Sequence, residues 1–291
     1  MSGIFKNILV PIDFDDNTEV AVKQAIELAC TDGATIHLLH VIKSKTVWNK
    51  LFGSIQTSLR PDDNRSSEIV MIKLQQWLQS IKETIPNTKI NTYVREGTVP
   101  GQIQNAAREI KPQLIIIGKN RYHKYFSLFN AICPNALAKS TGYPVLTVTR
   151  RTIYAKIKTI VVPVGSFIPT RKIELVIELA KKYRAAIHLI TIPDKVDFED
   201  IKGNSFLETY RILKTGLTNP IEHHILKGNN LPKAILEYAE CIGADLLLVN
   251  PGSETKISNI TGKHINDALA TTSKLKILSI EPYHGNELSA G

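Results

Sequence analysis

A glycine followed by a run of basic side chains is the part of this sequence that could most directly do chemistry. The stretch GKNRYHK begins at Gly118, directly after an apolar run, and places Lys119, Arg121, His123 and Lys124 within one short loop. Glycine lets a ligand approach the backbone closely, and free amides at the start of a helix bind phosphate. The loop could therefore hold a phosphate, bind an anion through side-chain charge alone, or be an ordinary solvated loop.

Asp13 is the second residue of interest, because it closes the first apolar run of the chain, ILVPI. If both apolar runs are neighbouring strands of one parallel sheet, Asp13 and Gly118 meet at the carboxyl ends of those strands. Ligands bind there in open α/β sheets, at the point where the chain order reverses. The Asp13 carboxylate could contact such a ligand or cap the helix that follows it.

The chain repeats itself, and the repeat indicates how these residues are positioned. Four segments of the first half return in the same order about 130 to 150 residues later. The pairs are Lys6–Asp13 and Lys158–Gly165, Ile26–Val41 and Ile177–Ile192, Val99–Gly118 and Leu231–Asn250, and Tyr143–Val148 and Leu275–Ile280. Matching segments in the same order predict one fold that is used twice.

Within each half, apolar runs alternate with helical patterns. Residues 8–12 are a continuous apolar run typical of a strand buried on both faces, and residues 16–30 have the spacing of an amphipathic helix. This alternation predicts an α/β fold of two tandem doubly wound domains, each a five-stranded parallel sheet with helices on both faces. We expect the domains over residues 1–150 and 155–282, followed by a short tail over 283–291.

These segments resemble the universal stress protein family in its tandem two-domain form. The resemblance is carried by ILVPIDF, AIELACTDGATIHLLHV, REGTVPGQI, LIIIG and PVLTV, and it covers nearly all of each half. It implies the strand order 3-2-1-4-5 in each half and pairing through the fifth strands. In this chain, Pro144–Val148 and Lys276–Ile280 would then face each other within one molecule.

In nucleotide-binding members of the family, two residues separate a first glycine from a second glycine, and nine residues separate the second glycine from a third. A serine or threonine directly follows the third glycine. Gly118 fits the first position, but Arg121, Ala131 and Ile132 stand at the others. Bulky side chains there would fill the space of a phosphate, so we expect no cofactor, with ATP or AMP as the alternative. The candidate ligand residues of this crevice are Pro11, Ile12, Asp13, His40, Val41, Gly118, Lys119, Arg121, Ala131 and Ile132.

The second half departs further from the nucleotide-binding pattern, because Gly165 replaces the aspartate and Asn250 the first glycine. The stretch NPGSETKISNITGKH nevertheless keeps two glycines and several serine and threonine hydroxyls, so it could still bind an anion. The candidates of this second crevice are Gly165, Asn250, Gly252, Ser253, Gly262, Lys263 and His264.

Other classes of site are not expected. His223 and His224 are adjacent in a predicted strand, so their side chains point to opposite faces and cannot easily chelate one metal ion. His37 and His188 recur at equivalent strand positions and are interpreted as structural. The net charge of +9 is interspersed with acids and forms no nucleic-acid motif, so no specific nucleic acid is expected. No apolar run is long enough to span a membrane, and the three widely spaced cysteines suit a cytoplasmic protein.

Two functions fit these residues. The first is a non-enzymatic, cytoplasmic stress-response protein that binds a ligand or an unknown protein partner, with degenerate nucleotide crevices and an internal pseudo-dimer that could assemble further. The second is an ATP- or AMP-binding protein that uses the first crevice. The segment Lys43–Asn64 follows the second predicted strand and could act as a lid over that crevice or as a partner contact.

Overall fold

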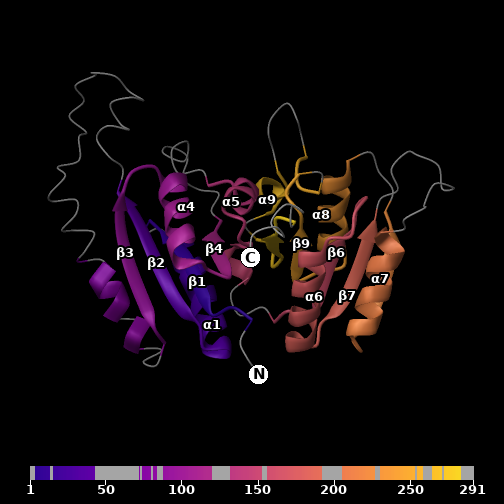
Figure 1. Cartoon of the computed structure of the whole chain (residues 1–291), viewed down its shortest axis with the longest axis horizontal. Helices are drawn as coiled ribbons and strands as arrows, with labels where there is room; N and C mark the ends of the chain where they lie inside the picture. The colour runs from indigo at the N-terminus through magenta and orange to yellow at the C-terminus, as the bar shows by residue number, and fades with distance from the viewer. Residues whose placement is uncertain are drawn as a thin grey trace, which may run out of the picture.

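The computed structural model of the chain contains two α/β units that share a single sheet of ten strands (Figure 1). The strands lie in the order β3-β2-β1-β4-β5-β10-β9-β6-β7-β8, so each half has the order 3-2-1-4-5. Within each half the strands are parallel. The predicted fold class is therefore confirmed. The structure describes residues 4–13, 16–42, 72, 74–79, 81–83, 88–119, 132–152, 156–191, 205–226, 230–252, 254–257, 264–270 and 272–282.

The described elements alternate between strand and helix along most of the chain. The first half contains β1 (Asn7–Ile12), α1 (Asp16–Asp32), β2 (Thr35–Ile42), β3 (Ile90–Glu96), α4 (Val99–Ile110), β4 (Leu114–Gly118), α5 (Pro134–Thr141) and β5 (Val145–Val148). A short 3-10 turn, η1 (Arg150–Thr152), follows. The second half contains β6 (Thr159–Pro163), α6 (Thr170–Tyr183), β7 (Ala186–Thr191), α7 (Ser205–Gly216), β8 (Ile221–Ile225), α8 (Leu231–Cys241), β9 (Leu246–Val249), α9 (Ile265–Ala268) and β10 (Lys276–Ser279).

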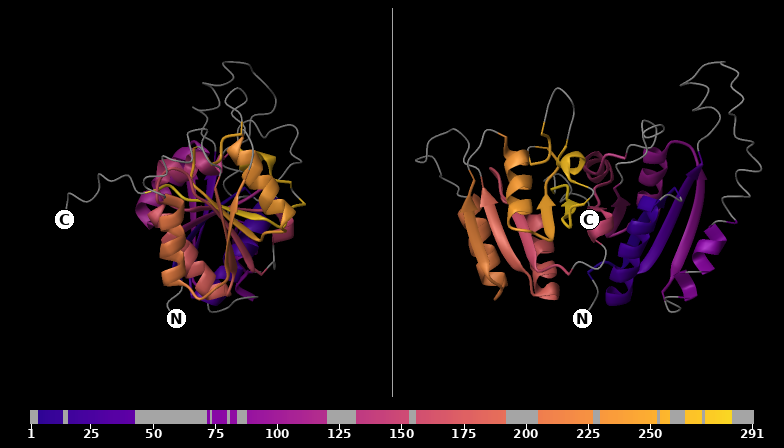
Figure 2. Two further views of the ribbon diagram at one scale, coloured as in Figure 1. Left: turned by 90° about the vertical axis from the view of Figure 1, so that its right-hand side faces the viewer. Right: turned by 180° about the vertical axis from the view of Figure 1, so that it is seen from behind.

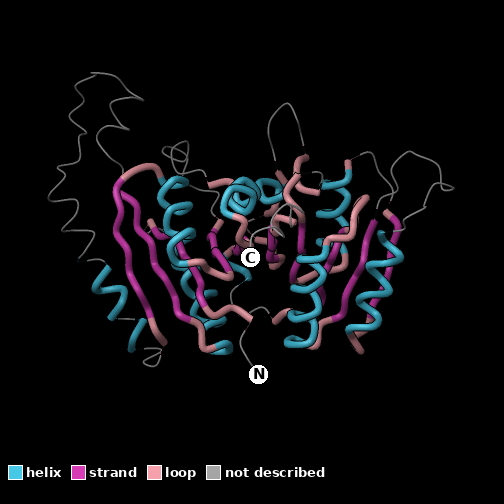
Figure 3. Tube along the Cα trace, in the orientation of Figure 1, coloured by secondary structure: helices cyan, strands magenta, loops and turns pink. Residues whose placement is uncertain are grey.

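Helices cover both faces of the sheet (Figure 3). Successive residues of a strand point to opposite faces, so each strand contributes side chains to the core on both sides. Ile8 and Val10 pack on the face covered by α1, where one apolar cluster continues into the second half under α6 and α7. Leu9 faces α4 and α5 instead. On that side the second half has a cluster of its own under α8 and α9. The strands of the two halves cross one another in the side view because the sheet is strongly twisted (Figure 2).

The two halves are joined edge to edge by β5 and β10. These strands pair antiparallel, with Leu146 opposite Leu278 and Thr147 opposite Ile277. The pairing continues one parallel sheet into the other, so neither fifth strand is left as a free edge.

A chain of buried polar side chains crosses this junction. Ser279 Oγ donates to Asn135 Oδ1 (2.7 Å), Asn135 Nδ2 donates to Asn266 Oδ1 (2.9 Å), and Asn266 Nδ2 donates to Thr147 Oγ1 (2.8 Å). All four side chains belong to residues that are at most 2% exposed. Asn135 in α5 and Asn266 in α9 occupy equivalent places in PNALA and INDALA, so the network follows the internal repeat. Buried polar groups that satisfy one another in this way favour one relative placement of their elements.

Several predicted regions lie outside the described residues, among them the segment Lys43–Asn64 and the tail over 283–291. In the described part of the chain, no helix combines the length and apolar character needed to cross a membrane.

Candidate functional site

The first crevice lies where β1 and β4 end. These strands are in register only at Ile8–Leu114 and Leu9–Ile115, whereas the register of β1 with β2 continues as far as Ile12–His40. The carboxyl ends of β1 and β4 are therefore not paired with each other. This is the switch point at which a parallel sheet of this order can admit a ligand.

Asp13 lies at this crevice but is already engaged by the chain itself. Thr18 Oγ1 donates to Asp13 Oδ1 (2.5 Å), and the Asp13 amide donates to Thr18 Oγ1 (3.0 Å). This reciprocal pair ties the end of β1 to the first turn of α1. The residue Asp13 is nevertheless exposed, so its carboxylate combines a structural contact with access to solvent.

His40 lies beside Ile12, at the end of β2. Its Nδ1–H donates to the carbonyl of Ile12 (2.9 Å), which fixes the proton on that nitrogen because a carbonyl can only accept. Burial lowers the pKa of His40, and the hydrogen bond to Ile12 opposes that shift. Val41, the next residue, packs against the apolar cluster under α4 and α5.

The free energy of unfolding is expected to fall as the pH is lowered from about 7.5 to 5.5, and His40 should account for part of the loss. Its folded pKa lies below the ordinary value of 6.5, so the unfolded chain takes up the proton first as the pH falls. The stabilisation is complete above pH 6.5 and is lost as the pH falls through the folded pKa. His40→Asn keeps an N–H donor for Ile12 and should flatten this dependence in urea unfolding. An unchanged slope would contradict the assignment.

The start of α5 offers little to a phosphate. Cys133 is the N-cap residue and makes no side-chain capping hydrogen bond, and Pro134 at the first helical position has no N–H to donate. Ile132, at the position where the resemblance implies a hydroxyl for nucleotide binding, packs against the apolar cluster beneath α4 and α5. Gly118 continues β4 and is paired with Val148. Arg121 and Ala131 lie outside the described residues.

Lys119, a candidate ligand residue of the basic loop, contacts the second half of the chain. Its Nζ donates to the carbonyl oxygens of Asp267 (2.9 Å) and Leu269 (2.8 Å), and also to that of Asn266. These carbonyls lie at the end of α9, where a positive charge is favourable. Lys119 therefore links the first crevice to the second half of the molecule.

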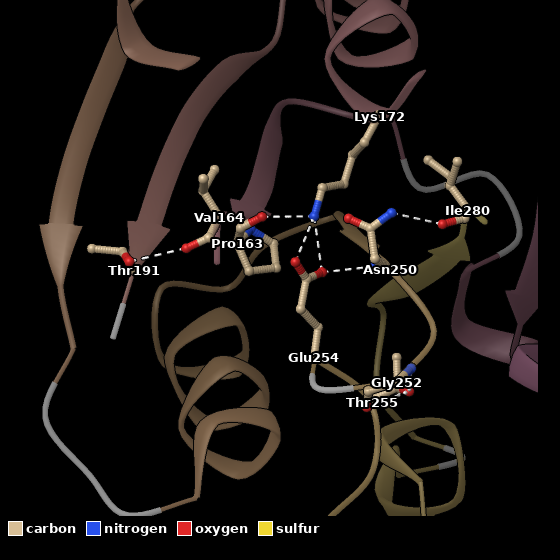
Figure 4. A network of polar contacts seen from close by, with 9 residues as sticks. All are labelled: Pro163, Val164, Lys172, Thr191, Asn250, Gly252, Glu254, Thr255 and Ile280. Atoms are coloured by element: carbon tan, nitrogen blue, oxygen red, sulfur yellow. Dashed lines mark hydrogen bonds and ion pairs between the residues drawn. The ribbon is translucent and has the colours of Figure 1, made fainter. Parts of the chain in front are cut away.

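A buried ion pair lies at the second crevice, where β6 and β9 end (Figure 4). Lys172, from the first turn of α6, donates to both carboxylate oxygens of Glu254 (2.9 and 2.8 Å) and to the carbonyl of Pro163 (2.7 Å). Glu254 Oε2 also accepts the amide of Asn250 (2.6 Å). The Lys172 side chain is 0% exposed and the Glu254 side chain 4%. A carboxylate of the protein thus holds the ammonium and the amide that an anionic ligand would need.

Burial and pairing act in opposite directions on this pair. Burial lowers the pKa of Lys172, and the Glu254 carboxylate raises it. Burial raises the pKa of Glu254, while Lys172 and the Asn250 amide lower it. Because the pair forms hydrogen bonds at every charged oxygen, each charge depends on the other for its stability.

The other described candidates of the second crevice also have partners within the chain. The Gly165 carbonyl accepts from Ser205 Oγ (2.7 Å), and Asn250 Nδ2 donates to the carbonyl of Ile280 (2.8 Å). Gly252 adopts φ +116° and its amide donates to Thr255 Oγ1 (3.0 Å). The amide of His264, at the start of α9, donates to the Asp267 carboxylate (2.8 Å). Ser253, Gly262 and Lys263 lie outside the described residues.

Lys172 and Glu254 were not among the candidate residues predicted from the sequence. The available signal was the helical spacing of Lys172 with Val176 and Leu179, which places a lysine on the apolar side of α6. A lysine in that position needs a buried partner. No pattern in the sequence distinguishes Glu254, because it lies in a loop among several other polar residues.

Comparisons with known proteins agree with this architecture. The model of the universal stress protein family matches residues 4–148. Universal stress protein G of Escherichia coli O157:H7 is 30% identical over 122 residues, which cover 40% of this chain and 79% of the relative. A universal stress protein of Methanocaldococcus jannaschii is 24% identical over 161 residues, which cover 52% of this chain and 99% of the relative.

A solved structure extends the likeness in fold to both halves. The crystal structure of a universal stress protein from Archaeoglobus fulgidus is 15% identical, with a TM-score of 0.69 that covers 96% of this chain and 97% of the other. The strand order and the sequence relatives lead to one conclusion: this chain belongs to the universal stress protein family.

Proposed function

We propose that this chain is a non-enzymatic, cytoplasmic stress-response protein that acts by binding a small ligand or a protein partner, and that its second crevice binds no nucleotide. The observation that carries the proposal is the buried pair of Lys172 and Glu254. A nucleotide phosphate in the second crevice would have to displace a carboxylate that already holds Lys172 and the Asn250 amide. Breaking such a pair leaves a buried charge without compensation, which is strongly unfavourable.

The first crevice is the proposed place of ligand binding. Its strand ends are not paired with each other, and the exposed Asp13 lies there together with His40. ATP or AMP in this crevice is the alternative function. It is supported by the exposed Asp13 and opposed by Pro134 at the start of α5, which removes a phosphate-binding amide.

We further propose that the pairing of β5 with β10 replaces a dimer of two chains, so that the protein in solution has the mass of one chain. The support is the continuous sheet and the buried polar network between Asn135 and Asn266. Light scattering coupled to gel filtration tests this directly, and a stable dimer would show that the molecule uses another surface to assemble.

Thermal unfolding with ATP, AMP and cyclic AMP at millimolar concentration tests the two functions. A ligand at 100 times its dissociation constant stabilises a fold by about 2.7 kcal/mol. We expect no shift in the transition. A shift that disappears in Asp13→Ala but persists in Glu254→Gln would favour the alternative function in the first crevice. A shift that survives Asp13→Ala and grows in Glu254→Gln, where Lys172 loses the competing carboxylate, would overturn the proposal for the second crevice.

A further inference from the structure

Three potential metal ligands meet at the outer edge of the second half. His188 of β7 lies opposite Glu222 of β8 in the sheet register, and His224 of β8 is two residues further along the same strand. Residues two apart in a strand share a face, so Glu222 and His224 point to the side of His188. From the sequence, only the adjacent pair His223 and His224 was weighed as a metal site. His223 does point the other way, towards Tyr210 of α7, with the ring centroids 5.7 Å apart.

The three side chains are close enough to share one ion. One ligand atom from each lies within 4.8 Å of the others. His224 Nε2 is 3.4 Å from Glu222 Oε2, and His188 Nδ1 is 3.8 Å from the same oxygen. Ligands about 2.0–2.1 Å from a tetrahedral zinc ion are roughly 3.3 Å apart. Small side-chain movements would therefore complete the coordination geometry.

The surroundings favour an occupant at this place. His224 Nε2 is buried and makes no hydrogen bond, and its nearest charged neighbour is Glu222 Oε2 at 3.4 Å. The rings of His188 and His224 are nearly parallel at 8°. The Tyr238 hydroxyl of α8 contacts His188 Nδ1 at 2.9 Å, and a metal ion bound at this nitrogen would replace that hydrogen bond. Glu222 is 60% exposed in its side chain, which leaves the cluster accessible from solvent. A ring nitrogen that is buried without a partner costs free energy, and a bound cation would remove that cost.

The first half provides a natural comparison. His37 occupies the position of His188, but its strand partners are Asn91 and Tyr93 in place of Glu222 and His224. There, His37 Nδ1 contacts the Tyr93 hydroxyl (3.1 Å) and Nε2 contacts Asn7 Oδ1 (3.2 Å). Both ring nitrogens of His37 are thus satisfied by neutral groups. The same framework carries metal ligands in the second half and an ordinary hydrogen-bond network in the first.

We propose that His188, Glu222 and His224 bind a single divalent transition-metal ion, with Zn²⁺ the best match, and leave a fourth position for water or a partner's ligand. Two imidazole nitrogens and one carboxylate oxygen suit zinc and its neighbours. Calcium and magnesium prefer sites built from oxygen ligands and are not expected here.

Isothermal titration of the tag-free full chain with zinc chloride tests the proposal. We expect one equivalent to bind, and binding to weaken at least about 10-fold in the double variant Glu222→Asn/His224→Tyr. This variant installs the residues that the first half already carries at the matching positions, so it is designed to preserve the fold. His223→Ala, on the opposite face of β8, is the matched control and should bind as the wild type does.

Cobalt substitution gives a second readout. Co²⁺ in a site with nitrogen ligands should show visible absorption in the wild type and in His223→Ala, and this absorption should be absent from His188→Gln. Circular dichroism checks that each variant is folded. Absence of saturable binding to the wild type, or equal zinc affinity in the wild type and the double variant, would overturn the proposal.

Discussion

Replacing Glu254 with glutamine is expected to lower the free energy of unfolding by about 3–5 kcal/mol. The substitution preserves the shape of the side chain but removes its charge, and it leaves the Lys172 ammonium, 0% exposed, without a counter-charge. Lys172 would keep only neutral acceptors such as the Pro163 carbonyl, 2.7 Å away. Urea unfolding followed by circular dichroism measures the change.

A double variant separates the charge effect from a general loss of packing. Adding Lys172→Met to Glu254→Gln removes the buried ammonium, so the double variant should be more stable than Glu254→Gln alone. A further loss of stability on adding Lys172→Met would contradict the interpretation. Lys233→Met is the control, because the pair of Lys233 and Glu237 on α8 is exposed at 64% and 65% and should contribute no measurable stability.

Replacing Asn266 with alanine is expected to cost about 2–4 kcal/mol and to weaken the coupling between the two halves. The variant leaves Asn135 Nδ2 and Thr147 Oγ1 without the partners that they have at 2.9 and 2.8 Å. Asn135 and Thr147 are 2% and 1% exposed, so water cannot readily replace the lost contacts. Each buried polar group left in this way costs about 1–3 kcal/mol.

The position of the tryptophans makes the loss of coupling measurable. Both tryptophans, Trp48 and Trp77, belong to the first half, whereas circular dichroism reports on both halves. In the wild type the two signals should change together on unfolding, and in Asn266→Ala they should separate. Coincident transitions at an unchanged midpoint would show that the network does not join the halves. Asn105→Ala, on the exposed side of α4, serves as the control.

The fold could be predicted from the sequence because it depends on local patterns that occur in both halves of the chain. The apolar run ending at Asp13, the helical spacing after it and the matched segments of the second half were enough to predict two α/β units, and the resemblance to universal stress proteins implied their strand order. The resemblance to universal stress proteins also implied that the fifth strands face each other. Periodicity determines which face of an element is buried, and that information is contained in neighbouring residues.

The contents of the two crevices depended on contacts between residues far apart in the chain. Lys119 lies in a basic loop by sequence, yet it contacts carbonyls at the end of α9. Lys172 and Glu254 are separated by 82 positions and carry no shared motif. Spacing along the chain does not reveal which charged groups meet in space, because their pairing is set by where helices and loops end after packing.

The sequence by itself therefore determined the family architecture, the repeat and the location of both crevices. Only the tertiary structure decided that a buried ion pair lies at the second crevice, and that His188 meets Glu222 and His224 across two strands. The physical reason is that burial patterns are local, whereas charge compensation and ligand geometry arise from side chains brought together by the register of the sheet and the packing of helices on it.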